Sequence, residues 1–182
     1  ALGDAGLVAE GVAFHSGSQQ VRPEAFAAAA REALDVAAAA GLHAPVLDAG
    51  GGFPVAYRDP VPDIEAFAAA LRAAAPDVPL VIEPGRLLVA EAGVIRSTVL
   101  RVSRRPGVDA RRWVYLDVGR YSGLAETEGE AIAYRLRVPG RTGPCEPVVL
   151  AGPTCDGDDV LYRRTPCPLP LSLAAGDAVD LL

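Results

Sequence analysis

Three short apolar segments at nearly constant spacing constrain the fold more than any other feature of the sequence. They are residues 12–15, 46–48 and 80–83. His15 precedes Asp48 by 33 residues, and Asp48 precedes Glu83 by 35. Strands that alternate with helices at this interval predict βα units and parallel strands. Each segment ends in polar residues or glycines, and ligands bind at the carboxyl ends of such strands, so one pocket could receive all three signatures.

Alanine-rich stretches between these segments predict two helices. The first begins at Pro23, a position that suits its missing N–H, and runs to about Ala40, where Gly41 supplies a stop. The second begins after Asp63, a plausible N-cap, and ends at Pro76. Together with the apolar segments, these helices predict an α/β domain.

After Gly93 the pattern changes to strands without long helices. We expect strands at residues 94–102, 113–117, 132–138, 147–151, 160–162 and 177–182. The segment at 132–138 alternates apolar and polar residues, which is typical of a strand with one buried face. We therefore predict an α/β domain at residues 1–93 and an antiparallel β domain, a barrel or sandwich, at residues 94–182, with the boundary near residues 87 to 95.

Composition excludes several classes of partner. The chain has 182 residues and a net charge of −6, and no arginine cluster is interleaved with aromatic residues, which argues against a nucleic-acid surface. No apolar run reaches membrane-spanning length and no signal peptide is evident, so we expect a cytoplasmic protein without membrane contact. Cys145, Cys155 and Cys167 lack the paired spacing of a zinc site, and we predict free thiols and no metal.

The sequence contains no lysine, and its seventeen basic residues are all arginine. Any mechanism that needs an amine nucleophile therefore requires residues outside this sequence. Methionine is absent as well, even at position 1. We expect that the chain is an internal piece of a longer protein and that it is inactive alone.

Three consecutive glycines, Gly50, Gly51 and Gly52, follow the second apolar segment. Glycine costs backbone entropy in regular elements, so such a run suits a tight turn or a place where main-chain N–H groups approach a ligand. N–H groups without a neighbouring Cβ can close on a phosphate. A plain turn and an anion site are both compatible with this stretch alone.

Three further stretches carry candidate chemistry. Residues 15–19, His-Ser-Gly-Ser-Gln, offer an imidazole and hydroxyls, and residues 83–86, Glu-Pro-Gly-Arg, offer a carboxylate and a guanidinium. Residues 152–156, Gly-Pro-Thr-Cys-Asp, set a thiol beside a carboxylate. Taken singly, these could be a local turn, a structural ion pair and a chance pair. Together they fit pyridoxal 5′-phosphate better than a nucleotide. A carboxylate can pair with its protonated ring nitrogen, and glycine amides, a hydroxyl and an arginine can bind its phosphate.

In this order the four motifs resemble the fold-type III pyridoxal-phosphate decarboxylases, the ornithine, lysine, arginine and diaminopimelate group. The resemblance implies part of an alanine-racemase-like (β/α)8 barrel followed by the β domain. It implies that His15 stacks on the pyridine ring and that Glu83 pairs with the ring nitrogen. The residues that it implies for the phosphate are Ser18, Gly50, Gly51, Gly52, Gly85 and Arg86.

In the second domain, the resemblance implies a catalytic thiol at Cys155, which gives a proton to the carbanion, and a substrate contact at Asp156, which meets the distal ammonium. Relatives supply both residues across a homodimer interface. The Cys-Asp pair is similar to ornithine and lysine decarboxylases, whereas diaminopimelate decarboxylases usually have Cys-Glu-Ser. We therefore expect L-ornithine as substrate and putrescine as product, in polyamine synthesis, with lysine or diaminopimelate as alternatives.

Two features depart from the family pattern. The second acidic residue expected near the distal amine has three candidates, Glu126, Glu128 and Glu130. Matching the family pattern on Gly119 and Tyr121 points to Glu130. The Schiff-base lysine and a tyrosine expected after Leu182 both lie outside the sequence. A non-catalytic homologue that binds a partner protein is an alternative, but a protein-binding surface would not need the retained site residues.

Overall fold

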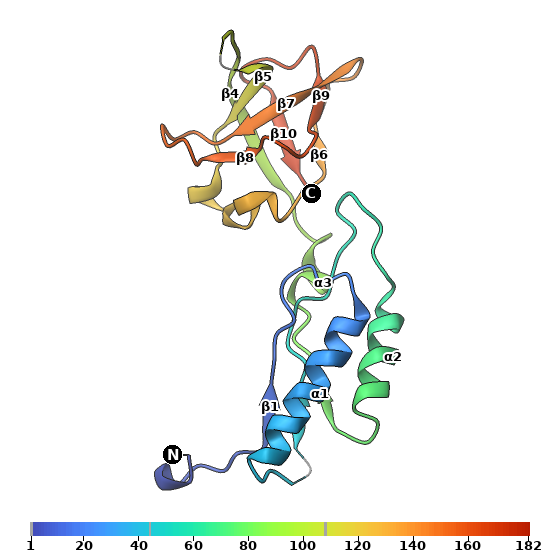
Figure 1. Ribbon diagram of the computed structural model, residues 1–182. Coiled ribbons are helices and arrows are strands. Elements are labelled where there is room, and N and C mark those ends of the chain that lie inside the picture. Colours follow the sequence, from blue (N-terminus) through green and yellow to red (C-terminus); the bar gives the residue numbers. More distant parts are fainter. Residues whose placement is uncertain (1, 44, 108) are drawn as a thin grey trace. The chain divides into compact units, whose positions relative to one another are not determined.

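The computed structural model describes residues 2–43, 45–107 and 109–182, and the chain divides into two compact units, residues 1–90 and 91–182. Figure 1 labels their helices and strands. We refer to these as unit 1 and unit 2. No helix in the described part of the chain is long and apolar enough to cross a membrane.

Unit 1 contains a parallel three-stranded sheet in the order β1-β2-β3. The strands are β1 (Gly11–Ala13), β2 (Val46–Asp48) and β3 (Leu80–Val81). Val12 lies opposite Leu47, and Leu47 lies opposite Leu80. The parallel pairing agrees with the βα spacing of the sequence.

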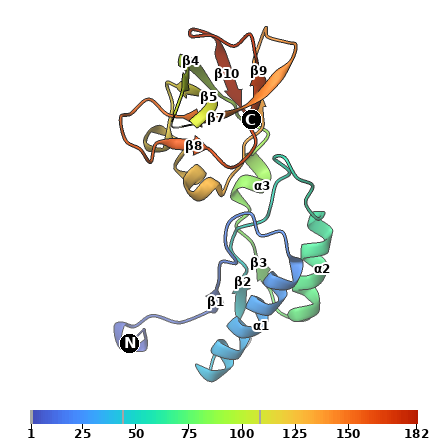
Figure 2. The ribbon, with the colours of Figure 1, turned by 45° about the horizontal axis from the view of Figure 1, so that its top comes forward.

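Two helices pack on this sheet, α1 (Pro23–Ala39) and α2 (Ile64–Ala74), and Figure 2 shows them beside β2 and β3. Their shared core with β2 includes Phe26, Leu47, Phe53, Phe67 and Leu71. The predicted helix bounds hold, with Gly41 in the left-handed region after α1 at φ +74°. Asp63 occupies the N-cap position of α2 but makes no side-chain cap hydrogen bond.

Two short helices in unit 1 were not predicted. A 3-10 helix, η1, spans Gly3–Ala5, and α3 spans Gly85–Val89. The third apolar segment was predicted to end at Glu83, and no helix was predicted directly after it. Instead Pro84 accepts a bond from Leu88 N, and Arg86 O accepts one from Ala90 N at 2.9 Å, so the turn continues as a helix.

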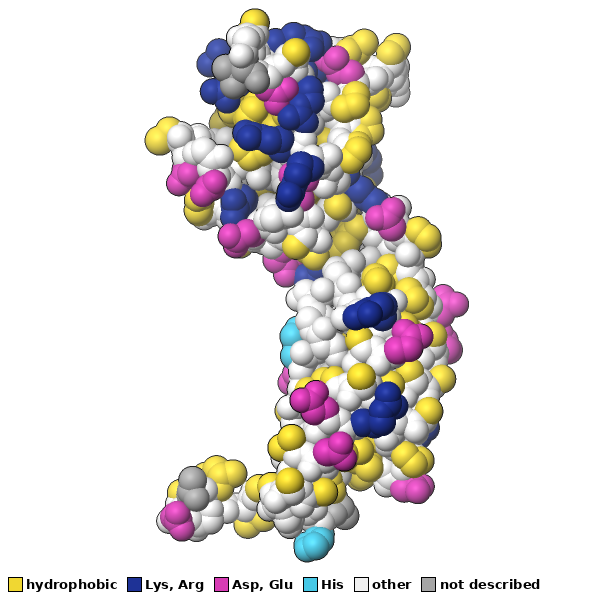
Figure 3. Space-filling model, viewed as in Figure 1, with side chains coloured by type: hydrophobic (Ala, Val, Ile, Leu, Met, Phe, Trp, Pro, Cys, Tyr) yellow, Lys and Arg dark blue, Asp and Glu magenta, His cyan; other side chains and the backbone are white. Residues whose placement is uncertain are grey.

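Unit 2 is a β unit whose main sheet has the order β6-β10-β4-β5-β7-β8, with β9 paired to β7. The long strands are β4 (Ile95–Arg105), β5 (Asp109–Leu116) and β7 (Cys145–Ala151). The short ones are β6 (Leu136–Arg137), β8 (Val160–Tyr162), β9 (Pro168–Pro170) and β10 (Ala178–Leu181). Its core includes Leu116, Leu124, Leu150 and Tyr162. Arginine side chains gather over this unit on the face shown in Figure 3.

The expectation of a wholly antiparallel domain was wrong in one place, because β5 and β7 pair in parallel. A parallel pair needs a long crossover connection. Here the chain leaves β5 and passes through two 3-10 helices, η2 (Arg120–Ser122) and η3 (Ala125–Glu130), and through β6 at the other side of the sheet before it returns as β7.

The predicted strand at residues 132–138 was also wrong, because only Leu136–Arg137 forms a strand. Ile132 is buried, as the alternation predicted. Its carbonyl, however, accepts a hydrogen bond from the Tyr162 hydroxyl at 2.9 Å, and the same hydroxyl accepts one from Tyr134 N at 2.9 Å. A side chain thus satisfies the backbone groups that a neighbouring strand would have paired.

Candidate functional site

The triple-glycine turn begins where β2 ends. The Asp48 carboxylate accepts a hydrogen bond from Gly50 N at 2.8 Å, and Gly50 and Gly52 have φ values of +61° and +93°. Only glycine adopts such angles without steric cost. After the turn, the Phe53 ring stacks on Phe26 with centroids 4.7 Å apart, which anchors the turn to α1.

Each of the three glycines lies against the backbone of another segment. A Cβ on Gly50 would overlap the carbonyl oxygen of Phe14, and a Cβ on Gly52 would overlap that of Gly17. A Cβ on Gly51 would lie 2.7 Å from the carbonyl oxygen of Glu83. The glycines are therefore required by close approach of the chain as well as by backbone angles.

The ends of the three strands thus meet at one place in unit 1. Glu83 N donates to Gly50 O at 2.8 Å, and Phe14 N donates to Asp48 O at 3.0 Å. The His15 imidazole lies beside the turn, with its Cε1 atom 3.4 Å from the Cβ position of Gly52. The structure brings together the imidazole, the three glycines and the main chain of Glu83.

The remaining candidates of unit 1 follow directly in the chain. Ser18 is exposed in the loop after β1, and Gly85 and Arg86 open α3 two and three residues after Glu83. Ser18 directly follows Gly17, whose carbonyl oxygen lies against Gly52.

The three glycines differ in what their N–H groups can do. Gly50 N is already bound to Asp48, so its contribution is the tight turn. In the part of the chain that the structure describes, no hydrogen bond occupies the N–H groups of Gly51 and Gly52. Amides of this kind, without side chains in the way, are the donors that a phosphate needs.

Two residues in the loop after β1 were not identified from the sequence. Ser16 Oγ is buried and has no hydrogen-bond partner among the described residues, which is a polar group suited to a ligand. Gln19 bonds to Val55, 36 residues further along the chain. The polar character of residues 16–19 was visible in the sequence, but contact across 36 residues has no local signal.

The glycine turn therefore offers groups whose chemistry suits a phosphorylated pyridine. Among the described residues these are two amides without an acceptor, a buried hydroxyl without a partner, and an imidazole next to a strand end that carries a glutamate.

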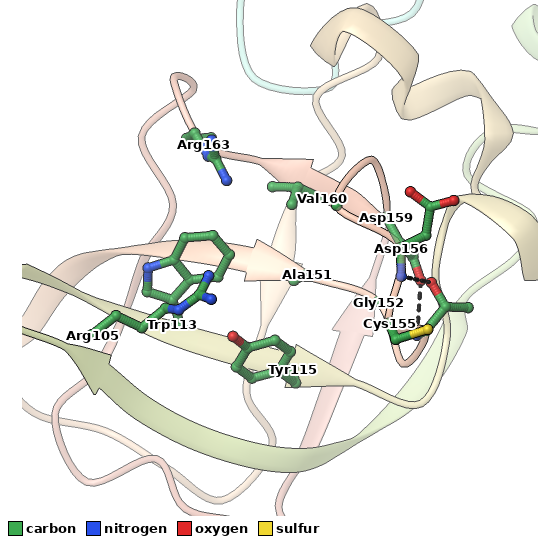
Figure 4. Close-up of a pocket in the computed structure, with 12 residues that line it drawn as sticks. Arg105, Trp113, Tyr115, Ala151, Gly152, Cys155, Asp156, Asp159, Val160 and Arg163 are labelled. Carbon is green, nitrogen blue, oxygen red and sulfur yellow. Dashed lines mark hydrogen bonds between the residues drawn. The ribbon is translucent and has the colours of Figure 1, made fainter. Parts of the chain in front are cut away.

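The Cys155 loop lies in unit 2, between β7 and β8. Cys155 is an exposed free thiol, and with Asp156 it lines a pocket of about 270 Å³. Figure 4 shows these two residues at one end of the pocket and Trp113 with Arg105 at the other. The guanidinium carbons of Arg105 and Arg163 lie 4.8 and 5.1 Å from the centre of the Trp113 ring.

Asp159 holds this loop in place and was not identified from the sequence. It is 2% exposed, and its carboxylate accepts bonds from Arg120 N at 2.8 Å, Thr154 N at 3.1 Å and Thr154 Oγ1 at 2.8 Å. Gly119 and Gly152 both lie so close to this carboxylate that a Cβ on either would overlap it. A buried carboxylate with such partners fixes the loop relative to the 119–120 segment.

Asp156 has partners of its own. Its carboxylate accepts a bond from the Tyr121 hydroxyl at 3.2 Å and one from Asp158 N at 2.9 Å. Desolvation and then the hydrogen bond to Asp156 raise the pKa of Tyr121. The carboxylate is exposed at the pocket, which leaves it accessible to a cation.

The Glu130 carboxylate is bound by backbone groups of unit 2. It accepts bonds from the backbone N–H groups of Arg163, Arg164 and Thr165. Burial raises its pKa, but these hydrogen bonds outweigh that effect and lower the pKa to about 2. The other two candidates are also engaged, because Glu128 pairs with Arg120 at 3.1 Å and Glu126 accepts a bond from the Tyr134 hydroxyl at 3.3 Å.

Residues 4–90 match the model of the pyridoxal-dependent decarboxylase family, specifically its pyridoxal binding domain. These residues form a pyridoxal binding domain of the pyridoxal-dependent decarboxylase family. The match covers the glycine turn, the His15 loop and the Glu83 corner, and the family's cofactor is pyridoxal phosphate.

Sequence alignments with decarboxylases cover nearly the whole chain. It is 35% identical to the lysine/ornithine decarboxylase of Selenomonas ruminantium over 97% of its length, and 34% identical to a diaminopimelate decarboxylase of Actinosynnema pretiosum subsp. auranticum over 92%. These alignments cover 45% and 39% of the relatives, so the chain spans less than half their length.

Solved structures agree in fold. The lysine/ornithine decarboxylase of Vibrio vulnificus in complex with putrescine matches with a TM-score of 0.76 and 33% identity, covering 98% of this chain and 49% of that one. SrLDC in complex with pyridoxal phosphate and cadaverine matches with a TM-score of 0.74 and 33% identity, covering 98% of this chain and 47% of that one. The solved structures that match this chain are therefore fold-type III decarboxylases, and the match extends over nearly all of its residues.

Proposed function

We propose that the protein to which this chain belongs decarboxylates a basic amino acid, L-ornithine first and L-lysine second, with diaminopimelate as the remaining alternative. The observation that carries this proposal is the convergence of three strand ends on the Gly50–Gly52 turn. Residues 1–93 would be part of a (β/α)8 barrel that holds the cofactor, and residues 94–182 the β domain.

Within unit 1, different residues would bind different parts of the cofactor. The N–H groups of Gly51 and Gly52, with Ser18, Gly85 and Arg86, would hold the phosphate. Gly50 would shape the turn, since its own N–H is bound to Asp48. His15 would stack on the ring, and the Glu83 carboxylate would accept the hydrogen bond of the protonated ring nitrogen. When bound, pyridoxal phosphate withdraws electrons from the substrate α-carbon, so that carbon dioxide can leave.

Unit 2 would act on the substrate. The Cys155 thiol would transfer its proton to the α-carbon after carbon dioxide has left, which leaves a thiolate on Sγ. Asp156 would bind the distal ammonium of the substrate, because its carboxylate is exposed at the pocket and is oriented by Tyr121 and Asp158 N. We propose a homodimer in which one subunit supplies this loop to the site of its partner.

Ornithine and lysine are preferred on two grounds. The Cys155-Asp156 pair is similar to that of ornithine and lysine decarboxylases, and the matched Vibrio vulnificus lysine/ornithine decarboxylase has been crystallised with cadaverine and with putrescine. The diaminopimelate decarboxylases among the relatives are the reason to test that substrate as well.

The test is a product assay on the complete protein with ornithine, lysine, arginine and diaminopimelate in parallel. We expect the highest kcat/KM with ornithine and turnover of lysine. Activity confined to diaminopimelate would overturn the substrate assignment, and a lack of activity with all four would overturn the proposed function.

A second test concerns the thiol. Replacing Cys155 with alanine is expected to lower kcat by about 10²-fold or more, the usual contribution of a positioned acid, and to leave pyridoxal phosphate bound. Cys145→Ala is the matched control, because Cys145 is also exposed but lies on β7 outside the pocket. Unchanged turnover and product in the Cys155 variant would refute its role.

A further inference from the structure

The loop after β1 and the segment after the glycine turn are joined by one side chain. The Gln19 amide donates from Nε2 to Val55 O at 2.9 Å and accepts at Oε1 from Val55 N at 2.7 Å. Both bonds reach a single residue 36 positions away, so the amide pairs with Val55 as a neighbouring strand would. Such a two-point contact fixes orientation as well as distance.

Other contacts join the same two segments next to the proposed phosphate position. Gln20 N donates to Gly52 O at 3.0 Å, and Gly17 O lies against the Cα of Gly52. Residues 15–20 therefore lie along residues 50–55. Between the two ends are the N–H groups of Gly51 and Gly52, which donate to no acceptor among the described residues. On the far side, Phe53 fixes the turn to Phe26.

The backbone at Gln19 supports a special role for this residue. Gln19 has φ +54°, and among the described residues it is one of two non-glycine residues in the left-handed region, with Glu130. A non-glycine residue in this region costs conformational free energy that its surroundings must offset. Asparagine or glycine would be favoured there by the backbone alone, so the longer amide is explained by its bonds to Val55.

We propose that Gln19 is a positioning residue for phosphate recognition: it fixes the part of the loop that carries Ser18 against the glycine turn, so that Ser18 and the amides of Gly51 and Gly52 can bind one phosphate. The His15 end of the loop is held separately by the bond from Phe14 N to Asp48 O. The inference rests on the proposed cofactor site. It predicts that loss of the Gln19 amide weakens binding of the phosphate group more than binding of the ring.

The test measures the dissociation constants of pyridoxal 5′-phosphate and of pyridoxal, which lacks the phosphate, with the complete protein freed of cofactor. Gln19→Met keeps the size of the side chain and removes both bonds. We expect it to weaken pyridoxal 5′-phosphate binding by about tenfold and pyridoxal binding by less than about threefold. Gln20→Met is the matched control, because the bonds of the Gln20 side chain to the described residues stay in its own segment, at Ser16 O and Arg22 N.

Gln19→Asn provides a second variant should the methionine variant fail to fold. Asparagine tolerates the left-handed region but is one methylene too short for both bonds to Val55, so we expect the same selective loss. Equal weakening of the two ligands, or no weakening, would overturn the role of Gln19. Failure of the unaltered protein to bind pyridoxal 5′-phosphate would instead overturn the proposed function, and the inference with it.

Discussion

Gly52 illustrates how single residues set the geometry of the candidate site. Its φ of +93° and its contact with Gly17 O each exclude a side chain. Either requirement would favour glycine, and the two together make any substitution displace the loop after β1. A single substitution at Gly52 is therefore expected to disturb the proposed phosphate site.

Replacing Gly52 with alanine should lower the stability of unit 1 by about 2 kcal/mol, since strain at a left-handed position adds to a backbone overlap. It should also weaken pyridoxal phosphate binding by more than tenfold. Gly3→Ala is the control, because a Cβ at Gly3 meets no atom within 4 Å. Urea unfolding and cofactor titration measure both effects, and equal behaviour of the two variants would contradict the steric account.

Glu130 gives the clearest pH dependence at this scale. Its pKa is about 2 in the folded chain, below the ordinary value of 4.5. A carboxyl with a lowered pKa stabilises the fold above its unfolded pKa, and this contribution is lost as the pH falls through the folded value. The stabilisation from Glu130 is therefore complete near neutral pH and disappears between about pH 5 and pH 2.

Glu130→Gln should cost about 2 kcal/mol at pH 7, the scale of hydrogen bonds to a charged group, and the difference from the unaltered chain should shrink below pH 5. The side chain of Glu130 is 11% exposed, whereas that of Glu128 is 80% exposed. Glu128→Gln should therefore cost less than about 0.5 kcal/mol. Urea unfolding at several pH values measures these free energies. If the difference between Glu130→Gln and the unaltered chain did not change with pH, the lowered pKa of Glu130 would not be the source of the stabilisation.

At the scale of elements, the helix layer of unit 1 supports the strand ends that carry the site. Phe67 of α2 lies edge-on to Phe26 of α1 at 5.4 Å and to Phe53 at 5.9 Å. Because Phe53 directly follows the glycine turn, this aromatic cluster connects both helices to the proposed phosphate position. The packing of the helices and the geometry of the turn are thus coupled.

Phe67→Ala should lower the stability of unit 1 by about 3–5 kcal/mol, because it removes a fully buried ring and leaves a cavity. Ile64→Ala, one turn earlier on α2 and 38% exposed, should cost clearly less. Thermal or urea unfolding of the two variants tests this order. A larger loss for the Ile64 variant would show that the helix packs by another face.

At the scale of the whole molecule, the two units carry different parts of the proposed chemistry. Unit 1 holds the residues for the cofactor, and unit 2 holds the thiol and the carboxylate for the substrate. Neither contains a lysine. The lysine that the family resemblance implies for covalent binding of pyridoxal phosphate would therefore have to come from outside these 182 residues.

Expressed alone, the 182-residue chain should have no decarboxylase activity with any of the four substrates, whereas the complete protein should be active. The physical reason is the missing amine, since no other side chain here forms a Schiff base with an aldehyde at neutral pH. Carbon dioxide release assays on both proteins provide the comparison. Turnover by the isolated chain would disprove the assigned role of the absent lysine.

The sequence by itself determined the parallel βα pattern of unit 1, the bounds of α1 and β2, and the motifs that meet at the glycine turn, because helix periodicity, turn residues and strand spacing are local properties. It did not determine the parallel pairing of β5 with β7 or the irregular path of residues 132–135. Only the tertiary structure decided these, since they depend on a crossover connection and on the distant Tyr162 hydroxyl. The same holds for Gln19, Asp159 and Glu130, whose partners are fixed by packing between segments far apart in the chain.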